Sequence, residues 1–275
     1  MPSTSAPGRL ARVAAHVAAR PHETPRPGPV RGGVGGEVKE SKEEYPLVRA
    51  EGSAWEMGYQ HGQQAAPLIN KYLAWILRGR DPELVVADAL THEPGIQRLN
   101  SRLLEEVRGL AAGAGISYGE AMVCQTRGGG AVGASTAEAG ADTDGCTAFA
   151  LTGAATLDGQ PIAGQNQDIS PEMDEFGIVL HLIPTDGRPR VITFTFAGQL
   201  GYMGMNSEGV SHFANAVPDV PAADGAPPPE CGHYPLKRTC FEQHSVEDCG
   251  EPSHAWFRLR RVFATRAFHS VARLS

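Results

Sequence analysis

A cysteine stands directly after a glycine in the segment DTDGCTAF, and polar residues suited to acyl chemistry follow it. The pair is Gly145 and Cys146, with Asp168 closing the run GQNQD and Asn215 further along. Attack of the Cys146 thiol on the Gly145 carbonyl carbon would give a thioester, and hydrolysis would leave Cys146 as a new N-terminus. An α-amine with a pKa of about 7.7 to 8 can accept the proton of a thiol with a pKa of about 8.5. One residue would then supply both nucleophile and base.

The alternative for Cys146 is a small buried hydrophobic residue, which is what most lone cysteines are. The neighbouring residues favour the nucleophile. Gly145 has no side chain to shield its carbonyl, and Asp142, Asp144 and Thr147 make the junction polar rather than core-like.

The chain ahead of this junction is predicted to be mainly helical up to residue 120. Residues 45–50 alternate like a short strand, and Ser53 with Glu56 three residues later forms the pattern of a capping box at a helix start. Gly58 and Gly62 on one face of that helix allow another backbone to pack closely.

A second helix is predicted in IQRLNSRLLEEVRGLAAGAG, residues 96–115. Its apolar residues fall at three- and four-residue spacing, which indicates one buried face, and Gly113 supplies the expected stop.

From residue 146 onward the pattern changes to short runs rich in β-branched and aromatic residues, CTAFAL, QPIAGQNQD, GIVLHLIP, RVITFTFAG and GYMGMN. The dipeptides Asp158-Gly159 and Asp186-Gly187 between them are typical of hairpin turns, so the runs predict an antiparallel meander. Residues 126–145 are small and acidic without periodicity, which indicates an exposed, mobile connector. Cys146 is therefore expected at the first residue of the first strand.

These motifs resemble the isopenicillin-N acyltransferase (acyl-coenzyme A:6-aminopenicillanic-acid acyltransferase) family of N-terminal nucleophile hydrolases. The resemblance extends from about Tyr45 to about Asp248. The matching segments are DGCTAF at 144–149, GQNQD at 164–168, GMNSEGV at 204–210 with the later Asn215, and EMGYQHG at 56–62.

The resemblance implies an α+β fold, a four-layer αββα sandwich that this chain leaves incomplete at its C-terminus. It also implies a zymogen cut between Gly145 and Cys146 into an α chain and a β chain that stay associated. The enzyme would transfer or hydrolyse an acyl group of a small-molecule amide or acyl-CoA thioester, with no cofactor and no metal. Cys146 would be the nucleophile, Asp168 would orient its α-amine, and Asn215 would line the oxyanion side. The alternative for Asp168 is a turn residue at a strand end.

The chain departs from the family pattern in two respects. Gln167 stands where the family usually has an aromatic residue. The family also has a later Asn that completes the oxyanion hole and a later Arg, and neither has a counterpart here. The tail from Gly250 has five Arg and no strand-turn rhythm, which favours a frameshift or a truncated relative over a basic C-terminal helix.

A catalytically inactive shortened homologue is therefore the alternative function. A penicillin V amidase-like enzyme is disfavoured, because such enzymes begin at their cysteine whereas residues 45–145 precede Cys146 here. Three further residues have structural interpretations: His61 as a packing or capping residue, Asn206 as a turn former, and Cys124 as a core thiol.

Composition bounds the remaining possibilities. The 275 residues carry a net charge of −7 and no basic stripe interleaved with aromatic residues, so nucleic acid is not an expected partner. The longest apolar runs are far too short to span a membrane, so a membrane is not expected either. Five cysteines without a signal peptide favour the cytoplasm, and their spacing does not match structural zinc sites. The expected organisation is a disordered leader at 1–44, an α-chain-like segment at 45–145, a β-chain-like sheet at 146–249 and an atypical tail at 250–275.

Overall fold

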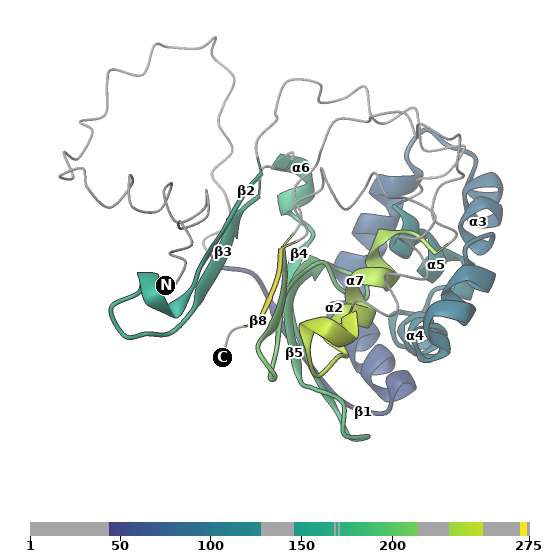
Figure 1. Cartoon of the computed structure of the whole chain (residues 1–275). Helices are drawn as coiled ribbons and strands as arrows, with labels where there is room; N and C mark the ends of the chain where they lie inside the picture. The colour runs from purple at the N-terminus through teal and green to yellow at the C-terminus, as the bar shows by residue number, and fades with distance from the viewer. Residues whose placement is uncertain are drawn as a thin grey trace, which may run out of the picture. The chain divides into compact units, whose positions relative to one another are not determined.

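The computed structural model of the chain describes residues 44–127, 146–167, 169, 171–213, 231–249 and 270–273. The expected leader up to residue 43, residues 128–145 of the expected connector and most of the tail lie outside the described residues. The described residues combine helices with a six-stranded mixed sheet and a separate two-stranded sheet (Figure 1).

Helices dominate the described part of the chain before Cys146, as predicted. They are α2 (Ala54–Leu77), α3 (Pro82–Leu90), α4 (Glu93–Ala114) and α5 (Tyr118–Thr126). The capping box that begins α2 is confirmed, because the Ser53 hydroxyl accepts the Glu56 N–H and the Glu56 carboxylate accepts the Ser53 N–H. The predicted stop at Gly113 is wrong. Helix α4 ends at Gly115, whose φ of 68° suits glycine, and Gly113 lies inside the helix.

Helices α2 and α4 cross so closely that glycines must stand at the contact. A Cβ atom on Gly58 would lie 1.9 Å from the carbonyl oxygen of Glu106, and one on Gly109 would lie 2.1 Å from that of Trp55. A Cβ on Gly62 would lie 2.3 Å from another carbonyl oxygen of α4. These distances are far inside van der Waals contact, so the close packing predicted for Gly58 and Gly62 is confirmed.

The larger sheet has the strand order β1-β4-β5-β6-β7-β8. Its strands are β1 (Leu47–Gly52), β4 (Gly177–Pro184), β5 (Val191–Phe196), β6 (Met203–Asn206), β7 (Val210–Phe213) and β8 (Ser270–Arg273). Strand β1 runs parallel to β4, and all other pairs are antiparallel. The predicted meander is thus confirmed for β4 to β7. Strand β8 was not expected, because the sequence of the tail shows no strand pattern.

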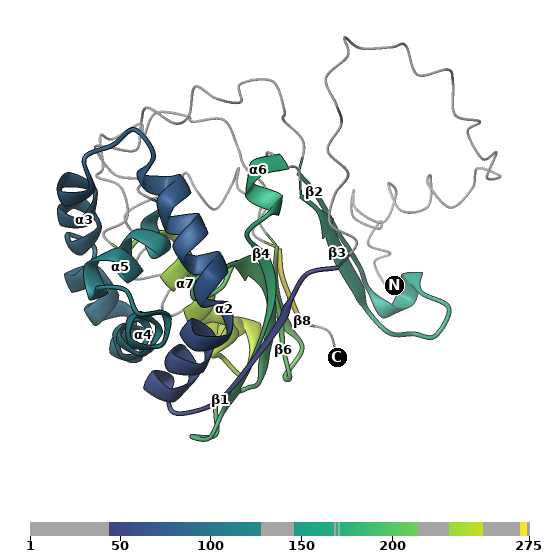
Figure 2. The same ribbon diagram turned by 180° about the vertical axis from the view of Figure 1, so that it is seen from behind.

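Strands β2 (Thr147–Leu151) and β3 (Ile162–Asn166) form the smaller sheet, an antiparallel hairpin. Gly159 in its connection has a φ of 73°, as the Asp-Gly dipeptide predicted. The prediction of one continuous meander from residue 146 is wrong, because β2 and β3 pair only with each other among the described strands and a short helix, α6 (Pro171–Asp174), leads on to β4. Figures 1 and 2 show the large helices on one face of the six-stranded sheet and the hairpin beyond its other face.

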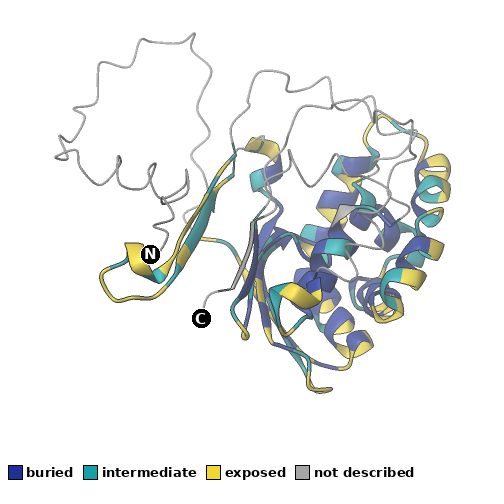
Figure 3. Ribbon diagram, viewed as in Figure 1, coloured by how far each residue is buried: buried dark blue, intermediate teal, exposed yellow. Residues whose placement is uncertain are grey.

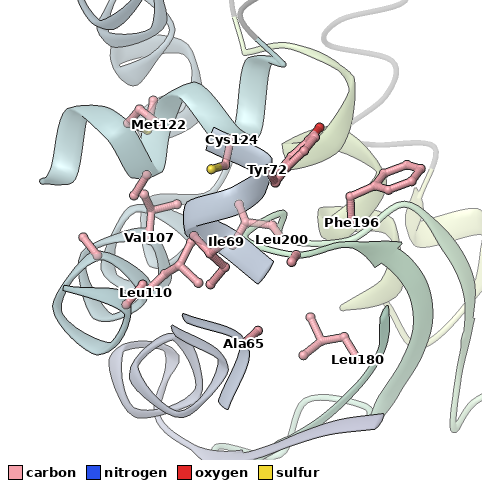
Figure 4. Close-up of a cluster of buried hydrophobic side chains, with 14 of the residues drawn as sticks. Ala65, Ile69, Tyr72, Val107, Leu110, Met122, Cys124, Leu180, Phe196 and Leu200 are labelled. Atoms are coloured by element: carbon pink, nitrogen blue, oxygen red, sulfur yellow. The ribbon is translucent and has the colours of Figure 1, made fainter. Parts of the chain in front are cut away.

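The main core lies between the helices and the six-stranded sheet. Figure 4 shows Ile69 and Tyr72 of α2 packed with Leu110 of α4 and with Phe196 and Leu200 from the sheet side. The Cys124 thiol is buried in this core, and burial raises its pKa to about 12, so its predicted structural role is confirmed.

The hairpin, by contrast, is largely exposed (Figure 3). Phe149 and Ile162 keep 49% and 48% of their surface accessible. Among the described residues, no helix combines the length and apolar character needed to cross a membrane.

Helix α7 (His233–Phe241) is fixed to the rest of the molecule by buried polar contacts. Arg238 bonds Glu106 of α4 at 3.0 Å and Glu242 at 2.9 Å. Asn206 accepts the Val210 N–H, which confirms it as a turn former, and it also donates to the Phe241 carbonyl oxygen at 3.0 Å. The position of α7 is therefore set jointly by α4 and by the β6–β7 turn.

We expect Gly58→Ala to destabilise the protein by about 1 to 3 kcal/mol, because the added methyl forces α2 and α4 apart and this exceeds the helix-propensity gain of about 1 kcal/mol. Urea unfolding measures the change. Gly119→Ala in α5 is the control, because its Cβ would lie 2.5 Å from a side-chain atom of Val86 rather than against backbone, and a side chain can move more easily than a helix. Equal effects of the two substitutions would contradict the close-crossing explanation.

Candidate functional site

Cys146 lies immediately ahead of β2, half-buried, within one residue of the predicted strand start. In the hairpin register Thr147 is opposite Asn166, so Gln167 follows at the level of Cys146 on the neighbouring strand. The Oε1 atom of Gln167 is buried and has no hydrogen-bond partner. The hairpin therefore brings the end of the GQNQD motif to the level of Cys146 on the neighbouring strand.

The other predicted site residues, Gly145, Asp168 and Asn215, lie outside the described residues. Asp168 is the next residue after Gln167 in the sequence. Cys146 is accordingly the one predicted site residue whose surroundings the structure describes.

Two cations and four aromatic rings gather beside Cys146, and we call this group the Arg127–Lys237 cluster. Its aromatic members are Tyr72 of α2, Phe196 of β5, Tyr202 just before β6, and Tyr234 of α7. Cys146 interacts electrostatically with Tyr202 and Lys237, which places its sulfur near the cluster.

Arg127 occupies the centre of this cluster. The carbon atom of its guanidinium group lies 4.7, 5.3 and 5.1 Å from the ring centroids of Phe196, Tyr202 and Tyr234. Its Nε and Nη2 atoms are buried and make no hydrogen bond of regular geometry, although the hydroxyl groups of Tyr72 and Tyr202 interact with the guanidinium group. It is also the only non-glycine among the described residues with a positive φ, 55°. The backbone thus accepts an unfavourable conformation at the residue that carries this charge.

Lys237 is the second cation, with 7% of its surface exposed. Its Nζ atom lies 4.1 Å from the centroid of the Tyr202 ring. Burial, and then the nearby charge of Arg127, lower its pKa to about 7. At neutral pH this amine is therefore close to half protonated.

The tyrosines of the cluster supply dipoles rather than negative charge. Burial raises the pKa of Tyr234 to about 12 and also raises the pKa values of Tyr72 and Tyr202. All three are therefore neutral at neutral pH. No ion pair joins Arg127 or Lys237 to an acidic side chain elsewhere in the described part of the chain. The cluster is a site of net positive charge.

Side chains of two helices form hydrogen bonds to the loop that leads from β5 to Tyr202. Gln125 of α5 donates to the Gly198 carbonyl oxygen at 2.6 Å and accepts the Leu200 N–H at 3.0 Å. His61 of α2 accepts the Gly198 N–H at its Nε2 atom, 3.2 Å away. Burial lowers the pKa of His61 to about 4, so it acts as a neutral acceptor. His61 thus has the structural role expected from the sequence.

Sequence reasoning missed both cations. Arg127 falls at the start of the predicted connector, although it is the only Lys or Arg between Arg108 and Arg188 and follows an apolar helix, a pattern that could have indicated a covered position. Lys237 had no local signal, because an isolated lysine in a helix is usually exposed.

The described residues contain no group of three or more His, Cys, Asp or Glu side chains arranged to hold a metal ion. No model of a known protein family matches the sequence.

We expect Lys237→Met to stabilise the protein at pH 7 by about 2 to 4 kcal/mol. The folded-state pKa of about 7 lies below the ordinary value of about 10.4, so the unfolded chain binds the proton more tightly. The penalty for charging Lys237 is therefore complete below pH 7 and fades as the pH rises toward about 10.4. Part of the gain is offset by the lost cation–π contacts, worth about 1 kcal/mol.

Urea unfolding of both proteins at pH 6, 7 and 10 measures this effect. Lys71→Met, at an exposed ion pair with Glu175, serves as the control and should change stability by less than about 1 kcal/mol. A stabilisation by Lys237→Met that grows with pH would contradict the assignment.

Proposed function

We propose that the chain is an autoproteolytic cysteine N-terminal nucleophile enzyme that transfers or hydrolyses the acyl group of an amide or acyl-CoA thioester. The observation that carries the proposal is the position of Cys146, at the start of a hairpin that returns to it through the GQNQD motif and beside a cluster of net positive charge. The proposal includes the four-layer αββα fold. A helical layer, a six-stranded sheet and a hairpin beyond the other face of that sheet support the first part of this layer order.

Maturation proceeds through an N-to-S acyl shift. The Cys146 sulfur attacks the Gly145 carbonyl carbon, the peptide C–N bond breaks, and the Cys146 nitrogen takes up a proton to become an amine. Water then attacks the thioester, which releases the Gly145 carboxylate and restores the thiol. The α-amine of Cys146 is created in this step and remains beside its own sulfur.

In turnover the α-amine accepts the thiol proton, and the sulfur attacks the carbonyl carbon of the substrate. The leaving amine or thiol takes that proton as the bond to the acyl carbon breaks, and water or a second acceptor then takes the acyl group from Cys146. Asp168 orients the α-amine, and Asn215 donates a hydrogen bond to the oxyanion. The charges of Arg127 and Lys237 favour both the thiolate and the oxyanion, because nearby positive charge stabilises each of them.

We expect the purified protein to consist of two fragments, with the smaller one beginning at Cys146, and Cys146→Ala to remain one chain. Intact mass and N-terminal sequencing measure this. Cys124→Ala, which alters a core thiol, is the matched control and should still be cleaved. Cleavage of Cys146→Ala at the same bond would remove the autoproteolytic mechanism.

We expect Asp168→Asn to slow maturation or turnover by on the order of a hundredfold, as is typical when a group that positions or transfers a proton is lost. The rate of fragment appearance after synthesis is the measurement. Asp158→Asn is the control, because Asp158 accepts the Gln160 N–H in the hairpin turn and asparagine can do the same. Maturation at the wild-type rate in Asp168→Asn would exclude the assigned role.

A further inference from the structure

The guanidinium group of Arg127 presents two buried donors with no acidic side chain among the described residues to accept them. Its Nε and Nη2 atoms make no hydrogen bond of regular geometry, and its polar neighbours are the neutral hydroxyl groups of Tyr72 and Tyr202. An arginine side chain stays protonated at any pH the fold survives, so this charge cannot be removed by titration. Burying a charge without a partner costs several kcal/mol, and proteins therefore pair nearly all of their buried charges.

The aromatic rings around Arg127 compensate only part of this cost. A cation–π contact contributes about 0.5 to 2 kcal/mol, and rings supply no acceptor in the plane of the guanidinium group. Lys237 adds to the positive charge that has no acidic partner, since it brings a second cation over the Tyr202 ring.

The pattern of the unpartnered donors indicates the shape of the missing acceptor. Nε and Nη2 lie on one edge of the guanidinium plane, and two parallel N–H groups on such an edge match the two oxygens of a carboxylate. The Lys237 amine offers a further donor in the same cluster. The rings of Phe196, Tyr202 and Tyr234 pack against one another and form an aromatic surface beside the guanidinium group.

We propose that the Arg127–Lys237 cluster binds a carboxylate group, carried by the substrate whose carbonyl carbon Cys146 attacks. The carboxylate lies against the Nε–Nη2 edge of Arg127 and receives a further hydrogen bond from the Lys237 amine, with the rest of an apolar or aromatic substrate against the rings. The part of this proposal that concerns the substrate rests on the proposed function. The part that concerns carboxylate binding does not.

Three groups from other elements face Lys237: Arg127 after α5, Tyr202 before β6, and Cys146 ahead of β2. Tyr234 faces it from α7 itself. A bound carboxylate adds a negative charge beside Lys237, so its binding draws a proton onto the Lys237 amine. Carboxylate binding is thus accompanied by proton uptake.

Benzoate is the probe, because it has a carboxylate and an aromatic ring but no bond that the enzyme can cleave. Titration calorimetry of the full chain with benzoate should show binding, with proton uptake in buffers of different ionisation enthalpy at pH 7.5. Benzamide, which has the same shape without the charge, should bind at least tenfold more weakly. Because benzoate is not turned over, the result does not depend on cleavage or catalysis.

Arg127→Gln and Lys237→Met should each weaken benzoate binding at least tenfold, and Lys237→Met should also abolish proton uptake. Lys237→Met is expected to fold well, so the test holds even if Arg127→Gln unfolds. The matched control is Arg108→Gln, because Arg108 also lies over a tyrosine ring, 5.4 Å from the Tyr118 centroid, but is exposed and paired with Glu105.

Failure of benzoate to bind, or equal binding by wild type and Lys237→Met, would overturn the carboxylate site. Tighter binding of inorganic phosphate than of benzoate would overturn the assignment to a carboxylate. If benzoate binds as expected but the chain is not cleaved at Cys146, the carboxylate site stands and the proposed enzymatic function fails.

Discussion

The close crossing of α2 and α4 is the constraint on which the helical layer depends. Glycines on both helices remove the side chains that would otherwise separate the two backbones, so each helix packs directly on carbonyl groups of the other. The rest of the site follows from this contact. Helix α2 carries Tyr72 to the cluster and His61 to the loop before Tyr202, while α4 presents Glu106 to Arg238 and thereby anchors α7. The two helices together thus position the loop before Tyr202 and helix α7, which both carry residues of the cluster.

Charged side chains inside this protein occur in two arrangements, with and without oppositely charged partners. Between α4 and α7 the charges neutralise one another: burial alone would raise the pKa of Glu242, but Arg238 and Arg188 lower it. Glu106 has only Arg238 within bonding distance, and burial raises its pKa. In the Arg127–Lys237 cluster the described residues supply no acidic partner at all. Ion pairs offset the cost of burying charges between α4 and α7, whereas two cations without an acidic partner lower stability and are suited to binding an anion.

The site lies where the two sheets approach each other, which explains why its parts come from so many elements. Strand β3 lies beside β7, and the hairpin brings Cys146 toward residues that reach it from the helical layer. The hairpin itself contributes little to the core, since its apolar side chains remain largely exposed. It holds the ends of β2 and β3 together, so that Cys146 and Gln167 lie at the same level on neighbouring strands.

Local features of this protein were determined by the sequence alone. The capping box at Ser53, the Asp-Gly turns, the helix-packing glycines and the start of a strand within one residue of Cys146 each depend on residues a few positions apart, so pattern and spacing were sufficient to predict them. The stop at Gly115, the separate hairpin and the bonds of Asn206 to the end of α7 were decided by tertiary packing. The same holds for the Arg127–Lys237 cluster. Its two cations lie far apart in the sequence, and an isolated charge is usually found on the surface. Only the packing of α7 on β6, β7 and α5 brings the two cations together and covers their charged groups, because this contact joins elements that are distant in the sequence.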